Sequence, residues 1–250
     1  MKNELWWNPQ AYSVVNQFRI KNALDTLKCL NIKADDLPQN IFDIGTGQGA
    51  VIHALALANP SSKFTAIDID AKMLKHAKKE YCASNINYIL ENILDISYTT
   101  CFDLVISFAC LHWIIDLQTA FKNISKSLKE KGKFAALMYP RSGIQFDAID
   151  EVVSKEKWRE YFKNFKTPLC KVNQYECEEL LRKANFSKIN VLKEEVILTT
   201  TREDFIKVTK SWIPHLQSLP NALHDDFLNE VADLLPSSPP VDQITFLAEK

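Results

Sequence analysis

Glycine is scarce in this sequence, with five residues among 250. A chain so poor in glycine rarely uses backbone angles that other residues avoid. Yet three of the five, Gly45, Gly47 and Gly49, lie at alternate positions directly after the apolar stretch 40–44. We therefore expect one tight turn there, running from a strand into a helix. Without side chains at the glycines, a ligand can approach the backbone of this turn closely.

Other absences exclude whole classes of protein. The formal net charge is −1, which argues against a dedicated nucleic-acid surface. No stretch approaches the roughly 20 apolar residues that a membrane span needs. The first seven residues carry an acid and no long apolar run, so we expect no signal peptide. These features indicate a cytoplasmic protein without membrane or nucleic-acid partners.

The six cysteines include no C-x-x-C pair, and His53, His76, His215 and His224 have no ligand-like spacing. Neither a zinc site nor a redox motif is therefore indicated, and we expect no metal. Most of the cysteines fall within apolar periodic segments. We expect these thiols to be reduced and buried.

Strand and helix patterns alternate through the first 139 residues. An amphipathic helix is expected over residues 12–30. Asp70 and Asp116 are placed to cap two later helices, and residues 131–133 to form a turn. Such alternation predicts an α/β fold with a parallel, doubly wound sheet. The expected strands are residues 40–44, 63–68, 87–90, 103–108 and 134–139, and the expected helices are residues 48–58, 71–83 and 117–128.

The pattern changes after Pro140, although the length suits a single domain with insertions, residues 1–250. The late helices form either a lid over the strand ends or further layers of the core. The expected helices are 144–165, 176–184, 203–212 and 222–235, and the expected strands are 188–199 and 243–248, with a loop at 236–240. The chain then divides into a helical cap (1–33), an α/β core (41–139) and two helical insertions (141–185 and 202–240).

Polar residues gather where the expected strands end. Ligands of open α/β sheets bind at the carboxyl ends of the strands, so these residues are expected to meet. They are Asp43 and the glycine turn after the first strand, Asp68 after the second, Glu91, Asn92 and Ile93 after the third, and Ser107, Phe108, His112 and Trp113 after the fourth.

Asp68 lies 23 positions after Gly45. An acid there can accept hydrogen bonds from both hydroxyls of a ribose. Its alternative role, capping the next helix, suits Asp70 better. Gly45-x-Gly47-x-x-Ala50 also satisfies the permissive dinucleotide fingerprint. Because NAD and S-adenosylmethionine both carry a ribose, Asp68 does not distinguish them.

Asp43 does distinguish them. It precedes Gly45 by two positions on the same strand, so its carboxylate would repel a pyrophosphate and attract the ammonium and sulfonium of S-adenosylmethionine. Asn92 can pair with an adenine edge while Ile93 frames the ring. The chain also has no second mononucleotide-binding half. These residues favour S-adenosylmethionine.

The segments 42–49, 66–70 with Met73 and Leu74, and 102–107 resemble the motifs of class I S-adenosylmethionine-dependent methyltransferases. The resemblance covers residues 41–139. It implies a Rossmann-like seven-stranded sheet with an antiparallel last strand, and S-adenosylhomocysteine as product. Asn92 departs from the family, where many members carry an aspartate. The implied cofactor-binding residues are Asp43, Gly45, Thr46, Gly47, Gly49, Asp68, Ile69, Asn92, Ile93, Ser107 and Phe108.

The flanking segments resemble narrower groups. Trp7-Asn8-Pro9-x-x-Tyr12 with Arg19 is similar to the start of trans-aconitate methyltransferases. Residues 111–114 and 205–227 resemble those enzymes and the juvenile hormone acid methyltransferases, and malonyl-carrier-protein methyltransferases are also similar. Leu-His-Trp here replaces the Leu-Gln-Trp of bacterial relatives. This resemblance implies methylation of a small-molecule carboxylate.

A carboxylate is ionised at neutral pH, so its methylation needs no general base. Alignment and well-placed hydrogen-bond donors would do most of the work. His112 and the Trp113 indole are the expected catalytic donors. The alternatives are a structural role for His112 and core packing for Trp113. The expected acceptor-binding residues are Tyr12, Gln17, Arg19, Tyr139, Arg141 and Trp212.

Three functions remain open from the sequence. The first is a methyltransferase acting on the carboxylate of a small molecule. The second is a methyltransferase on another acceptor, such as a carrier-protein acyl group or an amine. The third is a binding module that keeps the nucleotide fold without turnover, or an NAD-binding protein. The chain is expected to act as a monomer or a homodimer.

Overall fold

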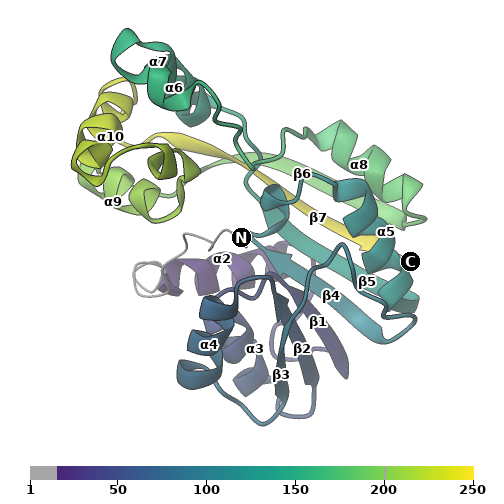
Figure 1. Ribbon diagram of the computed structural model, residues 1–250. Coiled ribbons are helices and arrows are strands. Elements are labelled where there is room, and N and C mark those ends of the chain that lie inside the picture. Colours follow the sequence, from purple (N-terminus) through teal and green to yellow (C-terminus); the bar gives the residue numbers. More distant parts are fainter. Residues whose placement is uncertain (1–15, 200) are drawn as a thin grey trace.

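A computed structural model describes residues 16–199 and 201–250 (Figure 1). One seven-stranded sheet has the order β3-β2-β1-β4-β5-β7-β6. Neighbours from β3 to β5 are parallel, and β7 runs antiparallel to both β5 and β6. The expected sheet is thus confirmed. Its strands are β1 (Asn40–Ile44), β2 (Lys63–Asp68), β3 (Ile86–Leu90), β4 (Phe102–Phe108), β5 (Leu128–Met138), β6 (Ser187–Ile197) and β7 (Pro240–Glu249).

The turn expected at residues 131–133 lies inside a strand. β5 begins at Leu128, which pairs with Phe102, and the register then jumps so that Lys133 pairs with Leu104. Lys131 takes a left-handed backbone angle (φ 62°) within this irregularity. The expected turn is therefore a bulge in β5, because pairing with β4 resumes on both sides of it.

Helices cover both faces of the sheet, as a doubly wound fold requires. One apolar cluster joins α2, α3 and α4 to one face, and another joins α5 and α8 to the other. α8 falls within the expected insertion 141–185 but packs against α5 and β6 on the sheet. The helices are α2 (Asn16–Cys29), α3 (Ala50–Ala58), α4 (Ala71–Glu80), α5 (Leu117–Ser127) and α8 (Gln174–Lys183), with the 3₁₀ turn η1 (Leu111–Trp113) after β4.

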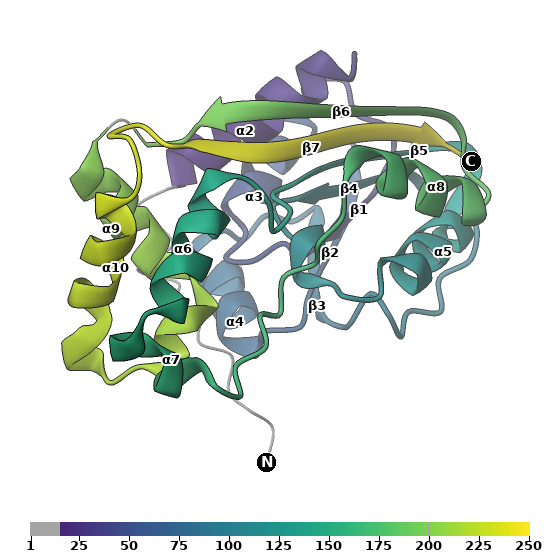
Figure 2. The same cartoon turned by 90° about the horizontal axis from the view of Figure 1, so that it is seen from above.

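The remaining helices form a helical subdomain with its own apolar core, which includes Trp158, Phe162 and Phe227. It stands beyond one end of the sheet, and the long strands β6 and β7 reach toward it (Figures 1 and 2). The helix expected over residues 144–165 is broken at Lys155, which has an extended backbone. The subdomain comprises α6 (Ile144–Ser154), α7 (Glu156–Phe162), α9 (Arg202–Trp212), η2 (Pro214–Ser218), η3 (Asn221–Leu223) and α10 (His224–Asp233).

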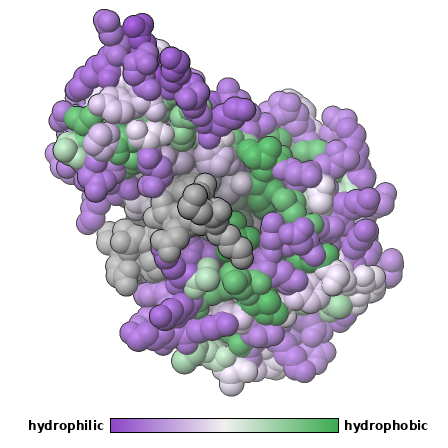
Figure 3. Space-filling view, in the orientation of Figure 1, coloured by the Kyte–Doolittle hydropathy of each residue, from purple (hydrophilic) through white to green (hydrophobic). Residues whose placement is uncertain are grey.

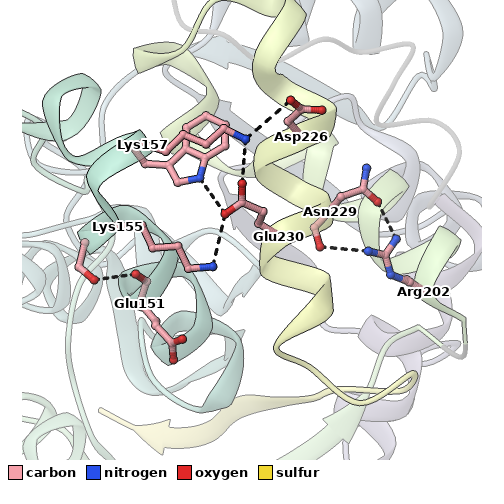
Figure 4. Close-up of polar contacts among 9 residues, drawn as sticks. Glu151, Lys155, Lys157, Arg202, Asp226, Asn229 and Glu230 are labelled. Carbon is pink, nitrogen blue, oxygen red and sulfur yellow. Dashed lines mark hydrogen bonds and ion pairs between the residues drawn. The ribbon is translucent and has the colours of Figure 1, made fainter.

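Polar contacts tie the helices of the subdomain together (Figure 4). Glu230 on α10 accepts hydrogen bonds from the Trp158 indole at 3.0 Å and from Lys157 at 2.8 Å, both on α7. Arg202 on α9 donates to the side chain and backbone oxygens of Asn229 on α10. The tip of the subdomain is hydrophilic (Figure 3), in keeping with apolar faces that turn inward. The core thus joins all four helices, and polar contacts at the surface join α7 and α9 to α10.

The expectation that the cysteines are buried is wrong for three of them. Cys29, Cys82 and Cys101 are exposed, whereas Cys170 and Cys177 are buried and Cys110 is half-buried. Cys29 is the last residue of α2, and Cys82 and Cys101 lie in the loops just after α4 and just before β4, which the apolar periodicity did not resolve. Within residues 16–199 and 201–250, no helix has the length and apolar character to cross a membrane.

Candidate active site

A cavity of about 490 Å³ opens at the carboxyl ends of β1, β2, β3 and β4. Its wall also includes residues of α2, of η1 and of the helical subdomain. The topology therefore brings together most of the side chains that the sequence singled out. Those lining the cavity are Arg19, Asp43, Gly45, Thr46, Gly47, Asp68, Ile69, Glu91, Asn92, Ile93, Phe108, His112, Trp113, Tyr139 and Trp212.

The three glycines of the turn have positive φ angles, but they are needed for different reasons. A Cβ on Gly45 (φ 73°) would lie 2.1 Å from Cys110 Sγ, so the turn packs directly on the segment after β4. A Cβ on Gly49 would lie 2.7 Å from the Tyr88 hydroxyl. Gly47 (φ 57°) has nothing within 4 Å of that position. Only Gly47 therefore leaves open space, and it leaves that space in the cavity wall.

Two buried carboxyl groups flank the turn. Asp43 on β1 is 5% exposed. Burial, reinforced by the negative charge of Asp68, raises the pKa of Asp43 to about 7. The Asp68 carboxylate accepts from the backbone N–H of Gly47 at 2.8 Å and of Asp70 at 2.9 Å, while burial raises its pKa. A cationic ligand would favour the charged form of both groups.

Asp70 caps α4, as expected, by accepting from Lys72 N and Met73 N. Asp68 is therefore left to hold the glycine turn and face the cavity. After β3, Asn92 Oδ1 accepts from Leu94 N at 3.1 Å, and the Ile93 side chain is buried. The amide nitrogen of Asn92 remains a hydrogen-bond donor in the cavity wall.

His112 has a defined tautomer. Its Nδ1 accepts a hydrogen bond from the backbone N–H of Tyr139 at 3.3 Å. Burial, with a further contribution from the charge of Arg19, lowers the pKa of His112 to about 3. The ring is therefore neutral, with its proton on Nε2. His112 is a donor through Nε2 and has no lone pair left to accept a proton.

Tyr139 lies beside His112, with ring centroids 5.9 Å apart. The Tyr139 hydroxyl accepts from Asn22 Nδ2 of α2 at 2.9 Å, and the charge of Arg19 also acts on it. Trp113 lines the cavity and packs against the core of the helical subdomain. A cation, a neutral imidazole N–H and a phenol thus meet near the junction of α2, η1 and β5.

Known proteins share this architecture. A methyltransferase domain family matches residues 42–136. Protein 235L of Invertebrate iridescent virus 6, whose name assigns it provisionally to the methyltransferases, is 24% identical over 90% of this chain and 83% of its own length. The juvenile hormone acid O-methyltransferase of Bombyx mori is 26% identical over 87% of this chain and 84% of that enzyme.

A solved structure of Haemonchus contortus phosphoethanolamine N-methyltransferase 2, holding S-adenosyl-L-methionine, superposes with a TM-score of 0.63 at 20% identity. It covers 92% of this chain, which spans about half of that longer enzyme (52%). The chain is an S-adenosylmethionine-dependent methyltransferase with the class I fold.

The cavity of this methyltransferase fits its cofactor. Gln48 Oε1 is buried beside the turn without a hydrogen-bond partner among the described residues, and the open side of Gly47 admits a ligand close to the backbone. Asp43 would attract the cationic methionine part, Asp68 would accept from the ribose, and Asn92 with Ile93 would frame the adenine. Among the described residues, no cluster of three or more acidic, histidine or cysteine side chains could hold a metal ion.

Several expected site residues of the methyltransferase lie elsewhere. The Ser107 hydroxyl is fully buried and donates to Ile44 O at 3.0 Å, so it joins β4 to β1. Gln17 is exposed on the outer side of α2. Gly49 packs against α4 and Tyr88 and not against the cavity. The side chains of Ser107 and Gln17 point away from the cavity, as would a side chain at Gly49.

Arg141 forms an ion pair with Asp150 and lies over the Phe146 ring at 5.7 Å. It braces the start of the helical subdomain and does not line the cavity. Tyr12 lies outside the described residues.

The cavity of the methyltransferase also contains residues that sequence reasoning missed. Gln48 stands between two of the conspicuous glycines and was visible in the sequence. An apolar stripe on α9 follows helical spacing and also signalled a buried face. The missed residues include Asn16, Asn22, Gln48, Cys110, Phe146, Leu169, Phe205 and Val208.

Proposed function

We propose that this methyltransferase transfers a methyl group to the carboxylate oxygen of a small molecule with an apolar body. The observation that carries the proposal is the meeting of Arg19, His112 and Tyr139 in one wall of the cavity. A guanidinium, an imidazole N–H and a phenol O–H together suit a carboxylate, which accepts several hydrogen bonds and carries a negative charge.

The tautomer of His112 supports a carboxylate over an amine. An amine acceptor is protonated at neutral pH and must lose a proton before it can react. His112 Nδ1 is occupied by the Tyr139 backbone N–H, so this ring cannot take that proton. A carboxylate is already ionised and needs only to be held and aligned.

The apolar body is inferred from the rest of the wall. Aromatic and aliphatic side chains from the helical subdomain and from the ends of β6 and β7 face the cavity. They would bury a hydrocarbon or aromatic group of the acceptor and keep water from the reacting atoms. They include Phe146, Leu169, Leu198, Phe205, Val208, Trp212 and Val241.

Each group then has a separate role in the proposed reaction. The bound cofactor supplies an electrophilic methyl group. Arg19 and Tyr139 would bind the acceptor carboxylate, and the His112 N–H would orient one oxygen of it. Trp113 would shape the same wall and exclude water. Asp43 would balance the positive charge of the methyl donor.

The relatives support the same class of acceptor. Juvenile hormone acid O-methyltransferases of Bombyx mori and Drosophila melanogaster align with 87% and 78% of this chain. Malonyl-[acyl-carrier protein] O-methyltransferases align with 37% and 51% of it in the examples from Priestia megaterium and Acetivibrio thermocellus. The longer alignments favour a free small molecule, and a carrier-bound acyl group is the second candidate.

The proposal also covers the roles of the helical subdomain and α2, the cellular location and the oligomeric state. The helical subdomain serves as a lid over the acceptor, and α2 as a cap. The protein works in the cytoplasm, in keeping with six free cysteines, and acts as a monomer or a homodimer without a nucleic-acid partner.

The test uses acceptors that differ only in their reacting group. Dodecanoic acid, dodecylamine and dodecanol are incubated with the protein and methyl-labelled S-adenosylmethionine, and malonyl-carrier protein is a fourth acceptor. We expect label in the acid alone. Label in the amine alone would overturn the carboxylate proposal, and label in the carrier protein alone would establish the second candidate.

A further inference from the structure

The Gln48 side chain is buried in the glycine turn with one half of its amide unused. The residue is 3% exposed and lines the cavity. Its Nε2 donates to Asn16 Oδ1 of α2, while its Oε1 has no hydrogen-bond partner among the described residues. A buried acceptor left without a donor destabilises the protein, because nothing replaces the hydrogen bond that it made to water. Such an atom in a cavity wall indicates that a ligand supplies the donor.

The α2 helix presents one polar face to the cavity. Asn16, Arg19, Asn22 and Ala23 all line it, and their spacing of three and four residues places them on the same side of a helix. Gln17 and Lys21 between them are exposed, whereas Phe18 also lines the cavity. The helix therefore runs along the cavity with its first turn near the glycine turn.

The two ends of this face bind different parts of the site. Asn16 contacts Gln48 and donates to the Tyr81 hydroxyl at 2.9 Å, on the side of the glycine turn and α4. Asn22 donates to the Tyr139 hydroxyl at 2.9 Å, next to His112. Arg19 lies between them in the sequence. A change in how the first turn of α2 is held would thus move groups assigned to the acceptor.

The ligand donor that suits Gln48 Oε1 is the ammonium of an amino acid. The buried Asp43 carboxyl lies on the strand that enters the same turn, so this end of the cavity already attracts a cation. An ammonium carries three N–H donors and needs several acceptors when it is taken out of water. The adenine and ribose parts of the cofactor are assigned to other residues.

We propose that Gln48 senses the amino-acid part of the cofactor and couples it to α2. Its Oε1 accepts from the cofactor ammonium, which fixes the amide so that Nε2 holds Asn16 and the first turn of α2. The helix then presents Arg19 and Asn22 to the acceptor. Bound cofactor consequently strengthens the binding of the acceptor, and the coupling is reciprocal. The acceptor part of this inference rests on the function proposed above.

The test compares two ligands that differ in the amino-acid part. S-adenosylhomocysteine has the ammonium and carboxylate, and 5′-methylthioadenosine lacks both. Affinities are measured calorimetrically, and hydrogen–deuterium exchange is followed in residues 16–29. In the unaltered protein we expect S-adenosylhomocysteine to slow exchange in these residues and 5′-methylthioadenosine to leave it unchanged.

Two substitutions separate the halves of the amide. Gln48→Met keeps the side-chain volume but removes both polar atoms, so it should weaken S-adenosylhomocysteine about tenfold and 5′-methylthioadenosine less than twofold. Asn16→Ala should keep most of the preference for S-adenosylhomocysteine but lose its protection of residues 16–29. Thermal unfolding of each variant checks that the fold is retained.

Equal weakening of both ligands by Gln48→Met would show that Gln48 only supports the turn and would overturn the inference. So would equal protection of residues 16–29 by both ligands. None of these measurements includes an acceptor. A wrong acceptor assignment would therefore appear only in the labelled-methyl assay, and a wrong role for Gln48 only here.

Discussion

The backbone N–H of Tyr139 donates to Nδ1 of His112 at 3.3 Å. This bond joins the end of β5 to η1 and fixes the imidazole as a neutral Nε2–H donor, in a site where burial lowers the pKa of His112 to about 3. The ring therefore holds one protonation state across the physiological pH range. It can orient an acceptor but cannot act as an acid–base group.

Replacing His112 tests this role. We expect His112→Phe to lower kcat/KM about 100-fold, the usual effect of removing one aligned donor, and His112→Gln, which keeps an N–H donor, to lower it less. With S-adenosylmethionine saturating, so that Asp43 is already ionised, the pH profile of kcat/KM for the acceptor should have no inflection near 6.5. The control is His76→Ala, which replaces a half-buried histidine of α4 outside the cavity. An inflection near pH 6.5 that disappears in His112→Gln would contradict the assignment.

Asp43 predicts a pH dependence of cofactor binding. Burial raises its pKa to about 7, so the free protein holds Asp43 protonated below that pH. A bound cation favours the ionised form, so binding below pH 7 releases a proton. The affinity for S-adenosylhomocysteine should therefore rise with pH by up to about tenfold per unit between pH 5.5 and 7, and level off above 7.

Calorimetry in buffers of different ionisation enthalpy measures the released proton directly. Asp43→Asn should bind more weakly and lose most of this slope. The pKa of Asp68 is also raised, so a slope that persists in full in Asp43→Asn would assign the proton to Asp68 instead.

Replacing Arg19 should weaken the binding of the acceptor but not that of the cofactor. Arg19→Met removes a guanidinium whose charge acts on both His112 and Tyr139. We expect the KM for a carboxylate acceptor to rise at least tenfold, in line with the loss of a charge-assisted hydrogen bond, with little change in S-adenosylhomocysteine affinity.

Lys21→Met is the matched control, because Lys21 is an exposed cation on the same helix that pairs with Asp25. An equal effect of both substitutions would mean that α2 charge acts only at long range.

The glycine turn predicts two different effects of the same substitution. Alanine at Gly45 or Gly47 adopts a left-handed angle at a cost of roughly 1–2 kcal/mol. At Gly45 the new Cβ also collides with Cys110, whereas at Gly47 it enters open space. Gly45→Ala should therefore lower the free energy of unfolding more than Gly47→Ala does, as measured in urea. Gly47→Ala should mainly weaken S-adenosylhomocysteine. Equal losses of stability would contradict the packing described for Gly45.

The order of the β/α units and the ends of β1 and β2 were predictable because local signals decide them. Apolar strands, the Asp70 and Asp116 caps and the glycine turn all act within a few residues, and β1 and β2 begin and end where expected. The way in which distant segments pair or pack is not decided by such local signals. The bulge in β5 depends on β4, and the packing of α8 depends on α5, so neither could be seen in the sequence near Lys131 or Glu176.

The candidate site shows the same division. Alternation along β1 correctly brings Asp43 to the cavity. The side-chain direction at Ser107 depended on a bond to Ile44 across the sheet, and Gln17 lies on the exposed side of a helix whose polar face turns inward. Gln48 was visible between two glycines, but its unused oxygen is a property of the folded chain alone.

The chemical nature of the methylated product tests the central claim most directly. The protein is incubated with methyl-labelled S-adenosylmethionine and an apolar carboxylic acid, and the isolated product is treated with mild alkali. A methyl ester releases its label as volatile methanol, which is the result that Arg19, His112 and Tyr139 predict. Label that stays with the product after alkali would place the methyl group on nitrogen or carbon and would contradict the account.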